Sequence, residues 1–354
     1  MKPPEPEYCL RAHNESVTCV RFVGSKLASG DTAGQAKLWD LVLQRPIVEW
    51  ASSTEGLLEV FEHAGGREVL TQARDGKIKL WDIERLSSPE TALSRSIHTD
   101  AFHFARCSVA RRGAVPDGAS NAAFDAPDAS DYLVLAPSEP MESMTLWDTR
   151  CETYAQRLVL SESDNKALGM VMSSKLWLPA ARGGRPLALI GYESGDVVAW
   201  DLTKMMPHLH SRCTVFKSPV MGLDIDEAGS RLFAAGIEPK ARVCRIDDHR
   251  IVPRGPALPV NCEASEHAKD GVGQLALRPD GKLFATGGWD YRIRLFSAKP
   301  PNYRPLAVLR YHDASVNALD FSPDSALLAA GSKDTKISVW RLYPPPCVEK
   351  KKKT

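Results

Sequence analysis

Residues 316–342 read VNALDFSPDSALLAAGSKDTKISVWRL, three short apolar runs separated by two turns. The first turn is SPDS at 322–325 and the second is KDTK at 333–336, and both are rich in residues that favour tight turns. The last run, ISVWRL, alternates apolar and polar residues, which is typical of a half-buried strand. The stretch therefore predicts three antiparallel strands joined by hairpin turns.

The ending of this stretch recurs along the chain with small changes. Seven endings are found: AKLWDL (36–41), IKLWDI (78–83), MTLWDT (144–149), VVAWDL (197–202), VCRI (243–246), IRLFSA (293–298) and ISVWRL (337–342). They recur roughly every 40–55 residues, except that the second and third begin 66 residues apart, and this is close to the period of about 40–45 residues that characterises WD40 repeats. A four-stranded sheet cannot bury both faces alone, so the repeats must close around an axis. The sequence predicts an all-β, seven-bladed WD40 β-propeller.

The two ends of the chain predict how the ring closes. After the last repeat only YPPPCVEKKKKT follows, which leaves the seventh blade without an outer strand. EYCLRAH at 7–13 resembles PLAVLRYH at 305–312, so the N-terminal segment is expected to supply that strand. We therefore assign residues 1–344 to a single propeller and residues 345–354 to a basic tail. Residues 108–131, rich in Ala, Asp, Pro and Gly, are expected to form a loop insertion in blade three.

Composition excludes several classes of protein. The formal net charge is +1, and no apolar run approaches the roughly 20 residues that cross a bilayer, so neither nucleic acid nor membrane is an expected partner. The eight cysteines contain no CxxC pair, which is typical of reduced thiols in the nucleus and cytoplasm. There is no phosphate-binding loop and no HExxH motif. His208, His210 and Cys213 lack a fourth ligand for zinc, so no metal, cofactor or catalytic residue is assigned and the chain is not expected to be an enzyme.

WD40 blades often contain a buried His–Asp–Ser/Thr–Trp hydrogen-bond chain, and this sequence matches it unevenly. Blade one lacks an Asp because Ala33 occupies that position, and blade seven has Ala330 at the Ser/Thr position. Blade two has no evident His, and blade six has Phe296 in place of Trp. We interpret the members present as structural. They are His13, Ser29 and Trp39; Thr71, Asp75 and Trp81; His267, Thr286 and Asp290; and His312, Asp334 and Trp340.

Function must then lie on the surface, and one rim of the propeller is the first candidate. Residues beside the Asp position of each blade are expected there, and the candidates are Arg74, Tyr192, Glu193, Trp289, Tyr291 and Lys333. An exposed tryptophan beside charged residues is typical of an interaction hot spot, whereas packing across a neighbouring blade is the alternative for Trp289. Similarly, the 108–131 insertion is either a partner-binding loop or a spacer.

Several stretches resemble one family within the WD40 class. They include GREVLTQARDGKIKLWDI (66–83), KALGMVMSSKLW (166–177), LALIGYESGDVVAWDL (187–202), LFATGGWDYRIRLF (283–296) and the final repeat through LYP at 342–344. They are similar to the ASTRA-associated protein 1 family, which includes the guanine-nucleotide-binding protein β-subunit-like proteins of animals. The resemblance fades at 108–131 and around 236–262.

This resemblance implies a non-enzymatic adaptor that is a monomer within a larger complex. Its implied partners are the Tel2–Tti co-chaperone subunits, the phosphatidylinositol-3-kinase-related (PIKK) kinases that they mature, and the Hsp90 machinery. It also implies the ASTRA complex, with links to chromatin remodelling and telomere maintenance. The sequence itself leaves open which face binds which partner.

Two alternatives belong to other functional classes. LWDTR at 146–150 has the WDxR ending found in substrate receptors of cullin–RING ubiquitin ligases. A Gβ-like signalling subunit would need an N-terminal coiled-coil helix, and little sequence precedes the first repeat.

Overall fold

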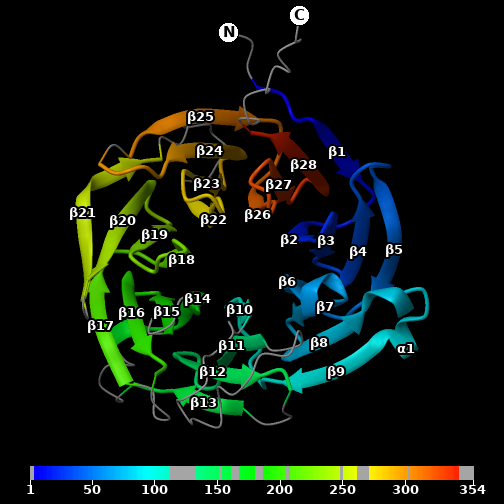
Figure 1. The fold of residues 1–354 in the computed structure, drawn as a ribbon, viewed down its shortest axis with the longest axis horizontal. Coiled ribbons are helices and arrows are strands. Elements are labelled where there is room, and N and C mark those ends of the chain that lie inside the picture. The colour runs from blue at the N-terminus through cyan, green and yellow to red at the C-terminus, as the bar shows by residue number, and fades with distance from the viewer. Residues whose placement is uncertain are drawn as a thin grey trace, which may run out of the picture.

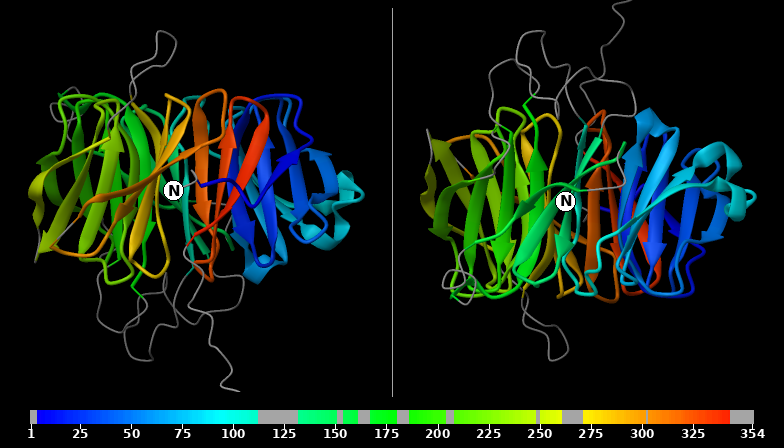
Figure 2. Two further views of the ribbon diagram at one scale, coloured as in Figure 1. Left: turned by 90° about the horizontal axis from the view of Figure 1, so that it is seen from above. Right: turned by 90° about the horizontal axis from the view of Figure 1, so that it is seen from below.

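The computed structural model describes residues 4–111, 132–150, 154–160, 167–179, 186–203, 208–247, 250–260, 271–301 and 303–342. Their strands form seven four-stranded antiparallel sheets arranged as blades around a central axis (Figure 1). Seen from the side, the blades form a disc whose strands run between its two faces (Figure 2). The predicted seven-bladed propeller is confirmed.

Each of the first three blades contains four strands that are consecutive in the sequence, ordered from the innermost to the outermost. Blade one contains β2 (Val17–Val23), β3 (Lys26–Asp31), β4 (Gln35–Asp40) and β5 (Arg45–Ala51); blade two contains β6 (Leu57–His63), β7 (Glu68–Ala73), β8 (Lys77–Asp82) and β9 (Leu93–His98); blade three contains β10 (Ser108–Arg111), β11 (Tyr132–Ser138), β12 (Ser143–Asp148) and β13 (Tyr154–Leu158).

The remaining blades repeat this order, except that the last borrows its outermost strand from the N-terminus. Blade four contains β14 (Val171–Trp177), β15 (Leu187–Tyr192), β16 (Asp196–Asp201) and β17 (His208–Thr214); blade five contains β18 (Val220–Ile225), β19 (Arg231–Gly236), β20 (Lys240–Asp247) and β21 (Arg250–Pro259); blade six contains β22 (Val272–Leu277), β23 (Leu283–Gly288), β24 (Arg292–Ser297) and β25 (Pro305–Arg310); blade seven contains β26 (Val316–Phe321), β27 (Leu327–Ser332), β28 (Lys336–Arg341) and β1 (Tyr8–Arg11).

Three short helical elements lie in blade two. These are η1 (Ala64–Gly66), η2 (Ile83–Arg85) and α1 (Pro89–Ala92). No helix in the described part of the chain has the length and apolar character needed to cross a membrane.

The N-terminal strand closes the ring, as the sequence predicted. β1 pairs antiparallel with β28, with Leu10 opposite Ile337 (Figure 1). The pairing extends one residue further, because the Glu7 N–H donates to the Val339 carbonyl at 2.8 Å. Leu10 is only 1% exposed and packs into a cluster that also contains Trp39 of blade one. Strand β1 therefore joins the first and last blades through both hydrogen bonds and apolar burial.

Each apolar core lies between neighbouring blades. The cluster at the closure, for example, joins Val20 and Trp39 of blade one to Ala318 and Val339 of blade seven. In blades one and four, the hairpin turn between the second and third strands requires glycine. Gly34 has φ +79° and Gly195 has φ +90°, and a Cβ on either would lie 2.2 Å from a backbone carbonyl oxygen. Only glycine fits such a left-handed, crowded turn.

Three local expectations differ from the structure or lie outside it. Residues 108–111, expected to begin the insertion, form β10, the innermost strand of blade three, while 112–131 lie outside the described residues. The segment around His208 and Cys213, expected as a loop between blades, is strand β17. The basic tail at 345–354 also lies outside the described residues.

Candidate functional site

The hydrogen-bond chain of blade one is complete, although the sequence placed Ala33 at its Asp position. His13 Nδ1 lies 2.7 Å from Asp31 Oδ2, and His13 Nε2 lies 2.7 Å from Ser29 Oγ. Trp39 Nε1 donates to the same hydroxyl at 2.8 Å. Asp31 lies two residues earlier than expected and also accepts the Ala33 N–H. Burial alone would raise the pKa of Asp31, but its hydrogen bonds with His13 and the backbone outweigh burial and lower it.

Blade seven completes its chain with a hydroxyl from a different strand. His312 Nδ1 lies 2.9 Å from Asp334 Oδ2, and His312 Nε2 lies 2.8 Å from Ser338 Oγ. Trp340 Nε1 donates to Ser338 Oγ at 2.8 Å. Ser338 on β28 is the register partner of Ala330 on β27, so the hydroxyl comes from across the hairpin. Burial opposes ionisation of Asp334, but His312 and backbone hydrogen bonds lower its pKa to about 2.

Blade two replaces the missing histidine with two serines. Ser52 Oγ lies 2.8 Å from Thr71 Oγ1, and Ser53 Oγ donates to Asp75 at 3.0 Å. Trp81 Nε1 donates to Thr71 Oγ1 at 2.8 Å. Thr71, Asp75 and Trp81 are therefore hydrogen-bonded without an imidazole at the predicted histidine position.

Blade six contains an ion pair between Asp290 and Arg294. Arg294 faces Thr286 across the hairpin and donates to both carboxylate oxygens of Asp290. Phe296, at the tryptophan position, is fully buried and stacks on Phe284 with centroids 4.8 Å apart. Thr286 Oγ1 is buried without a hydrogen-bond partner within the described residues, and His267 lies outside them. The blades therefore reach rigid interiors by different pairings of polar groups.

The central channel forms a cavity of about 1120 Å³ in which several charged side chains pair with one another. Arg21 contacts Asp320 at 3.0 Å and Glu59 at 3.4 Å. Lys175 contacts Asp224 at 2.8 Å on the other side of the channel. Burial, together with the nearby Glu59 carboxylate, outweighs the attraction of Arg21 and raises the pKa of Asp320 to about 6. These charges link neighbouring blades, because Asp320 of blade seven also accepts the N–H of Phe22 in blade one at 2.7 Å.

Two buried thiols, Cys19 and Cys107, have little nucleophilic character. Burial raises the pKa of Cys19 to about 12 and also raises the pKa of Cys107. A thiol attacks as the thiolate, so neither group is activated. Within the described residues, no group of three or more His, Cys, Asp or Glu side chains could hold a metal ion.

The six candidate rim residues differ in their exposure. Arg74, Glu193 and Lys333 are exposed in the β7–β8, β15–β16 and β27–β28 turns. Tyr192 is not on the rim: it ends β15, is 1% exposed, and donates its hydroxyl to the Glu142 carbonyl at 3.3 Å. The sequence placed this residue in a turn, but strand β15 extends through it, and the strand geometry directs the ring inward.

Trp289 and Tyr291 are both half-buried in the β23–β24 turn. A Cβ on Gly271 or Gly273 would lie within 3 Å of the Trp289 indole, so the ring covers two glycines at the start of β22. One side of Trp289 therefore packs within blade six, while the side chain also lines the channel cavity. Tyr291 has φ +73°, an uncommon conformation for a tyrosine.

Two exposed phenylalanines beside the β7–β8 turn, one of which lines the channel cavity, were missed from the sequence. Phe102 is 68% exposed and Phe104 is 63% exposed, and both lie in the connection from β9 to β10. The Arg74 guanidinium lies 4.5 Å above the Phe104 ring, a cation–π contact. The signal was the segment TDAFHFARC at 99–107, where aromatic residues lie between strands with no blade to bury them. We call Arg74, Phe102, Phe104, Trp289 and Lys333 the mouth patch.

The WDxR motif that suggested a ubiquitin-ligase receptor has a local explanation. Arg150 donates to both carboxylate oxygens of Asp148 in the same motif, at 3.1 and 2.9 Å. The guanidinium is thus held within its own blade.

The fold and its tryptophan-ended blades define the chain as a WD40-repeat propeller. The family model for the WD domain, G-beta repeat, matches residues 4–40, 260–297 and 303–341. The chain is 30% identical to the mouse (Mus musculus) guanine nucleotide-binding protein subunit beta-like protein 1, over 97% of this chain and 98% of that protein. It is 29% identical to ASTRA-associated protein 1 of Schizosaccharomyces pombe, over 97% of this chain and 100% of that protein. It is 28% identical to ASTRA-associated protein 1 of Verticillium alfalfae, over 96% of this chain and 93% of that protein. The chain belongs to this family of WD40 proteins.

Proposed function

We propose that this chain is a non-enzymatic adaptor of the ASTRA complex and the Tel2–Tti co-chaperone pathway, and that the mouth patch is its principal binding surface. In this role it supports the maturation and stability of PIKK kinases together with Hsp90, in the nucleus and cytoplasm. A link to chromatin remodelling and telomere maintenance follows from the same assembly. The names of the fungal relatives and the similarity over nearly the whole chain support the ASTRA assignment.

The observation that carries the binding role is the exposure of two aromatic rings in the mouth patch. Phe102 and Phe104 leave most of their surface in water, although burying a phenylalanine stabilises a protein by about 1.5–3 kcal/mol. Arg74 stacks on one of these rings, and the combination of aromatic side chains with arginine is enriched in interaction hot spots. A partner that covers the patch would gain apolar burial without rearranging the propeller.

The test is co-purification from the protein's own cells with paired variants. Phe102→Ala with Phe104→Ala truncates the mouth patch. Val42→Ala with Leu43→Ala is the matched control, because these residues are 89% and 59% exposed in the β4–β5 turn at the opposite face of the disc. We expect the wild type and the control to retain Tel2–Tti subunits and a PIKK kinase. The mouth variant should lose about 2 kcal/mol or more of binding, roughly a thirtyfold weakening.

Three outcomes contradict the proposal. Equal recovery by both variants would remove the mouth patch from the interface. Recovery of a cullin with its adaptor in place of the Tel2–Tti subunits would favour the ubiquitin-ligase alternative. Unfolding of the mouth variant, judged by its circular dichroism, would show that the rings have a structural role.

A further inference from the structure

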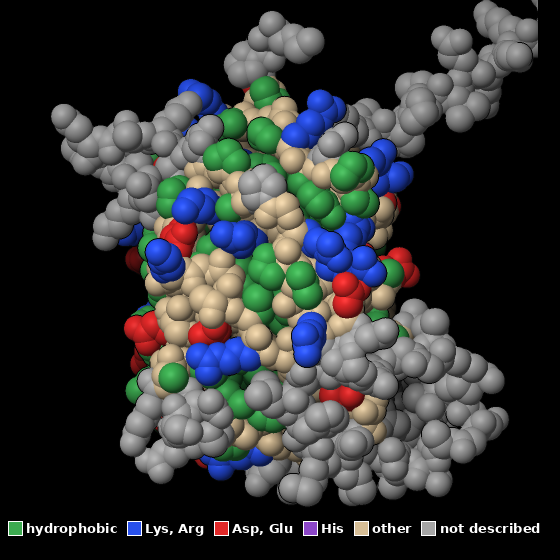
Figure 3. All heavy atoms as spheres, turned by 90° about the vertical axis from the view of Figure 1, so that its left-hand side faces the viewer, with side chains coloured by type: hydrophobic (Ala, Val, Ile, Leu, Met, Phe, Trp, Pro, Cys, Tyr) green, Lys and Arg blue, Asp and Glu red, His purple; other side chains and the backbone are tan. Residues whose placement is uncertain are grey.

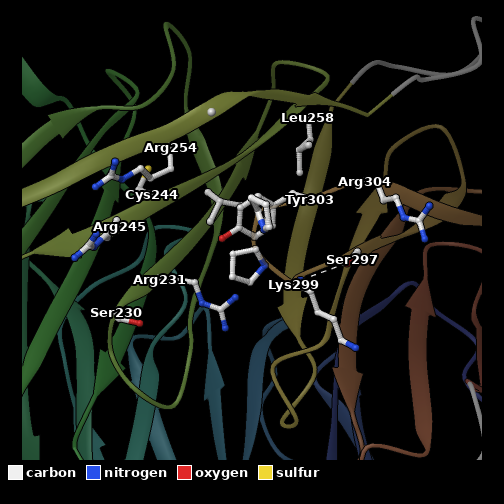
Figure 4. A pocket seen from close by; sticks show the side chains of 14 residues that line it. Ser230, Arg231, Cys244, Arg245, Arg254, Leu258, Ser297, Lys299, Tyr303 and Arg304 are labelled. Atoms are coloured by element: carbon white, nitrogen blue, oxygen red, sulfur yellow. Dashed lines mark hydrogen bonds between the residues drawn. The ribbon is translucent and has the colours of Figure 1, made fainter.

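A pocket of about 1250 Å³ opens on the circumference of the disc, between the outer strands of blades five and six. On the side of the disc that contains β21, basic side chains lie beside hydrophobic ones (Figure 3). Within the pocket, Tyr303 lies between Arg245 and Arg254 on one side and Lys299 and Arg304 on the other (Figure 4). The pocket is separate from the channel cavity, since the two share no lining residue among those described.

The pocket is strongly basic. Five of its described lining residues are Lys or Arg and none is Asp or Glu. Arg231 is held inside the fold, because it donates to Asp226 at 2.8 Å and to the Ala298 carbonyl. The outer residues are less compensated. Arg245 and Arg254 are about half exposed and share the single carboxylate of Asp247.

Lys299 and Arg304 are exposed and form no ion pair with any described residue. Like charges held near one another without counter-charges favour the approach of an anionic ligand. The whole chain has a formal net charge of only +1, so this local excess is not a property of the surface at large.

The pocket also has apolar walls. Leu258, Pro300 and Pro301 line it, and the Tyr303 ring packs edge-on against Phe233 with centroids 6.5 Å apart. The strand at its edge, β21, contains Pro253 and Pro259, which lack an N–H, so an added β-strand is disfavoured there. Recognition must then use side chains, with anionic groups against the rim and an apolar group against the walls.

We propose that this side pocket binds an acidic peptide segment of a partner protein, one that carries an apolar residue among its carboxylates. The basic rim pairs with the carboxylates, and the apolar residue packs beside Tyr303 and Leu258. Nucleic acid fits less well, because it selects an extended basic track with several stacking aromatic residues, whereas the described lining contains one aromatic side chain. This inference does not depend on the ASTRA assignment.

The test uses the purified full chain and a fluorescein-labelled peptide of about eight residues, seven glutamates around one leucine, which spans roughly 26 Å when extended. Fluorescence anisotropy measures its Kd at low ionic strength. The Lys299→Glu/Arg304→Glu variant should weaken binding about tenfold or more, because it reverses two exposed charges. Lys299→Arg/Arg304→Lys should retain binding. Neither residue's side chain has a hydrogen bond or ion pair with another described residue, so we expect the fold to be unaffected.

The matched control is Lys217→Glu/Arg85→Glu, which makes the same change in net charge at two exposed sites outside the pocket. Binding that weakens equally in the control and in the pocket variant would mean a general charge effect and would overturn the proposal. So would an absence of peptide binding, or equal binding when glutamine replaces each glutamate. Displacement of the peptide by a single-stranded oligonucleotide at lower concentration than by unlabelled peptide would point to nucleic acid instead.

Discussion

Removing the Ser338 hydroxyl should destabilise blade seven, and placing a hydroxyl at the opposite position of the hairpin should restore its stability. Ser338 is fully buried, and its Oγ bonds both His312 Nε2 and Trp340 Nε1. Ser338→Ala removes two hydrogen bonds of about 1 kcal/mol each and leaves a buried indole N–H unsatisfied, which costs about 1–3 kcal/mol more. We therefore expect the free energy of unfolding to fall by about 3–5 kcal/mol.

The rescue uses the register of the hairpin. Ala330 on β27 lies opposite Ser338, and in blade one the equivalent position on β3 holds Ser29, the hydroxyl that serves its chain. The double variant Ala330→Ser/Ser338→Ala should recover most of the lost stability, because the hydroxyl then reaches the same imidazole and indole from the other strand. Urea unfolding followed by tryptophan fluorescence gives both differences. A loss below about 0.5 kcal/mol for the single variant, or a double variant no more stable than the single one, would refute the reasoning.

Two further predictions concern closure and the channel. Leu10→Ala should lower the free energy of unfolding by about 2–5 kcal/mol, because this side chain is 1% exposed and lies between blades one and seven. Deletion of residues 1–12 should lower it further. Thermal unfolding measures both effects, and an unchanged melting temperature would contradict the role of this segment in closing the ring. Asp320 has a folded pKa of about 6 against 3.8 for the free side chain, so the folded state holds a proton that the unfolded state releases, and this group should lower stability as pH rises from about 4 to 6. Asp320→Asn should flatten that part of the pH profile of unfolding, and a profile identical to the wild type would refute the assignment.

The fold could be predicted because each repeat shows the same apolar spacing, the same turn residues and a similar period. Each ending combines an alternating strand with a turn, and its period identifies the blade, so losses such as Phe296 for tryptophan do not obscure the count. Closure by residues 8–11 was also predictable, because the N-terminal segment resembles the strand that precedes the last repeat. Patterns of this kind depend only on apolar spacing and turn chemistry, which a single sequence contains in full.

The polar details could not be predicted in the same way. A fixed offset from the repeat pointed to Ala33 and Ala330, whereas the structure uses Asp31 and Ser338. A carboxylate or hydroxyl can join the hydrogen-bond chain of a blade from any backbone position that places its side chain in the same space. The sequence alone does not identify those positions. Tyr192 was wrongly predicted on the rim for a related reason. Strand β15 extends to this residue, so its side chain is buried in the core.

The side pocket shows a different limit of sequence reasoning. Its basic residues come from β19, β20, β21 and the connection between β24 and β25, and they form no motif along the chain. The propeller alone brings them together, because blades five and six are neighbours in the ring.

The pairing of charges explains why binding belongs on the outside of this propeller. In the channel, Arg21 and Lys175 already have carboxylate partners, and separating these partly buried ion pairs to admit a ligand would leave their charges uncompensated. At the mouth patch, by contrast, exposed rings can be covered without breaking such a pair. The side pocket likewise has exposed cations at Lys299 and Arg304 that need no internal rearrangement. The channel cavity and the side pocket share no lining residue among those described, so the two proposed surfaces do not compete for the same side chains, as the proposed adaptor role requires.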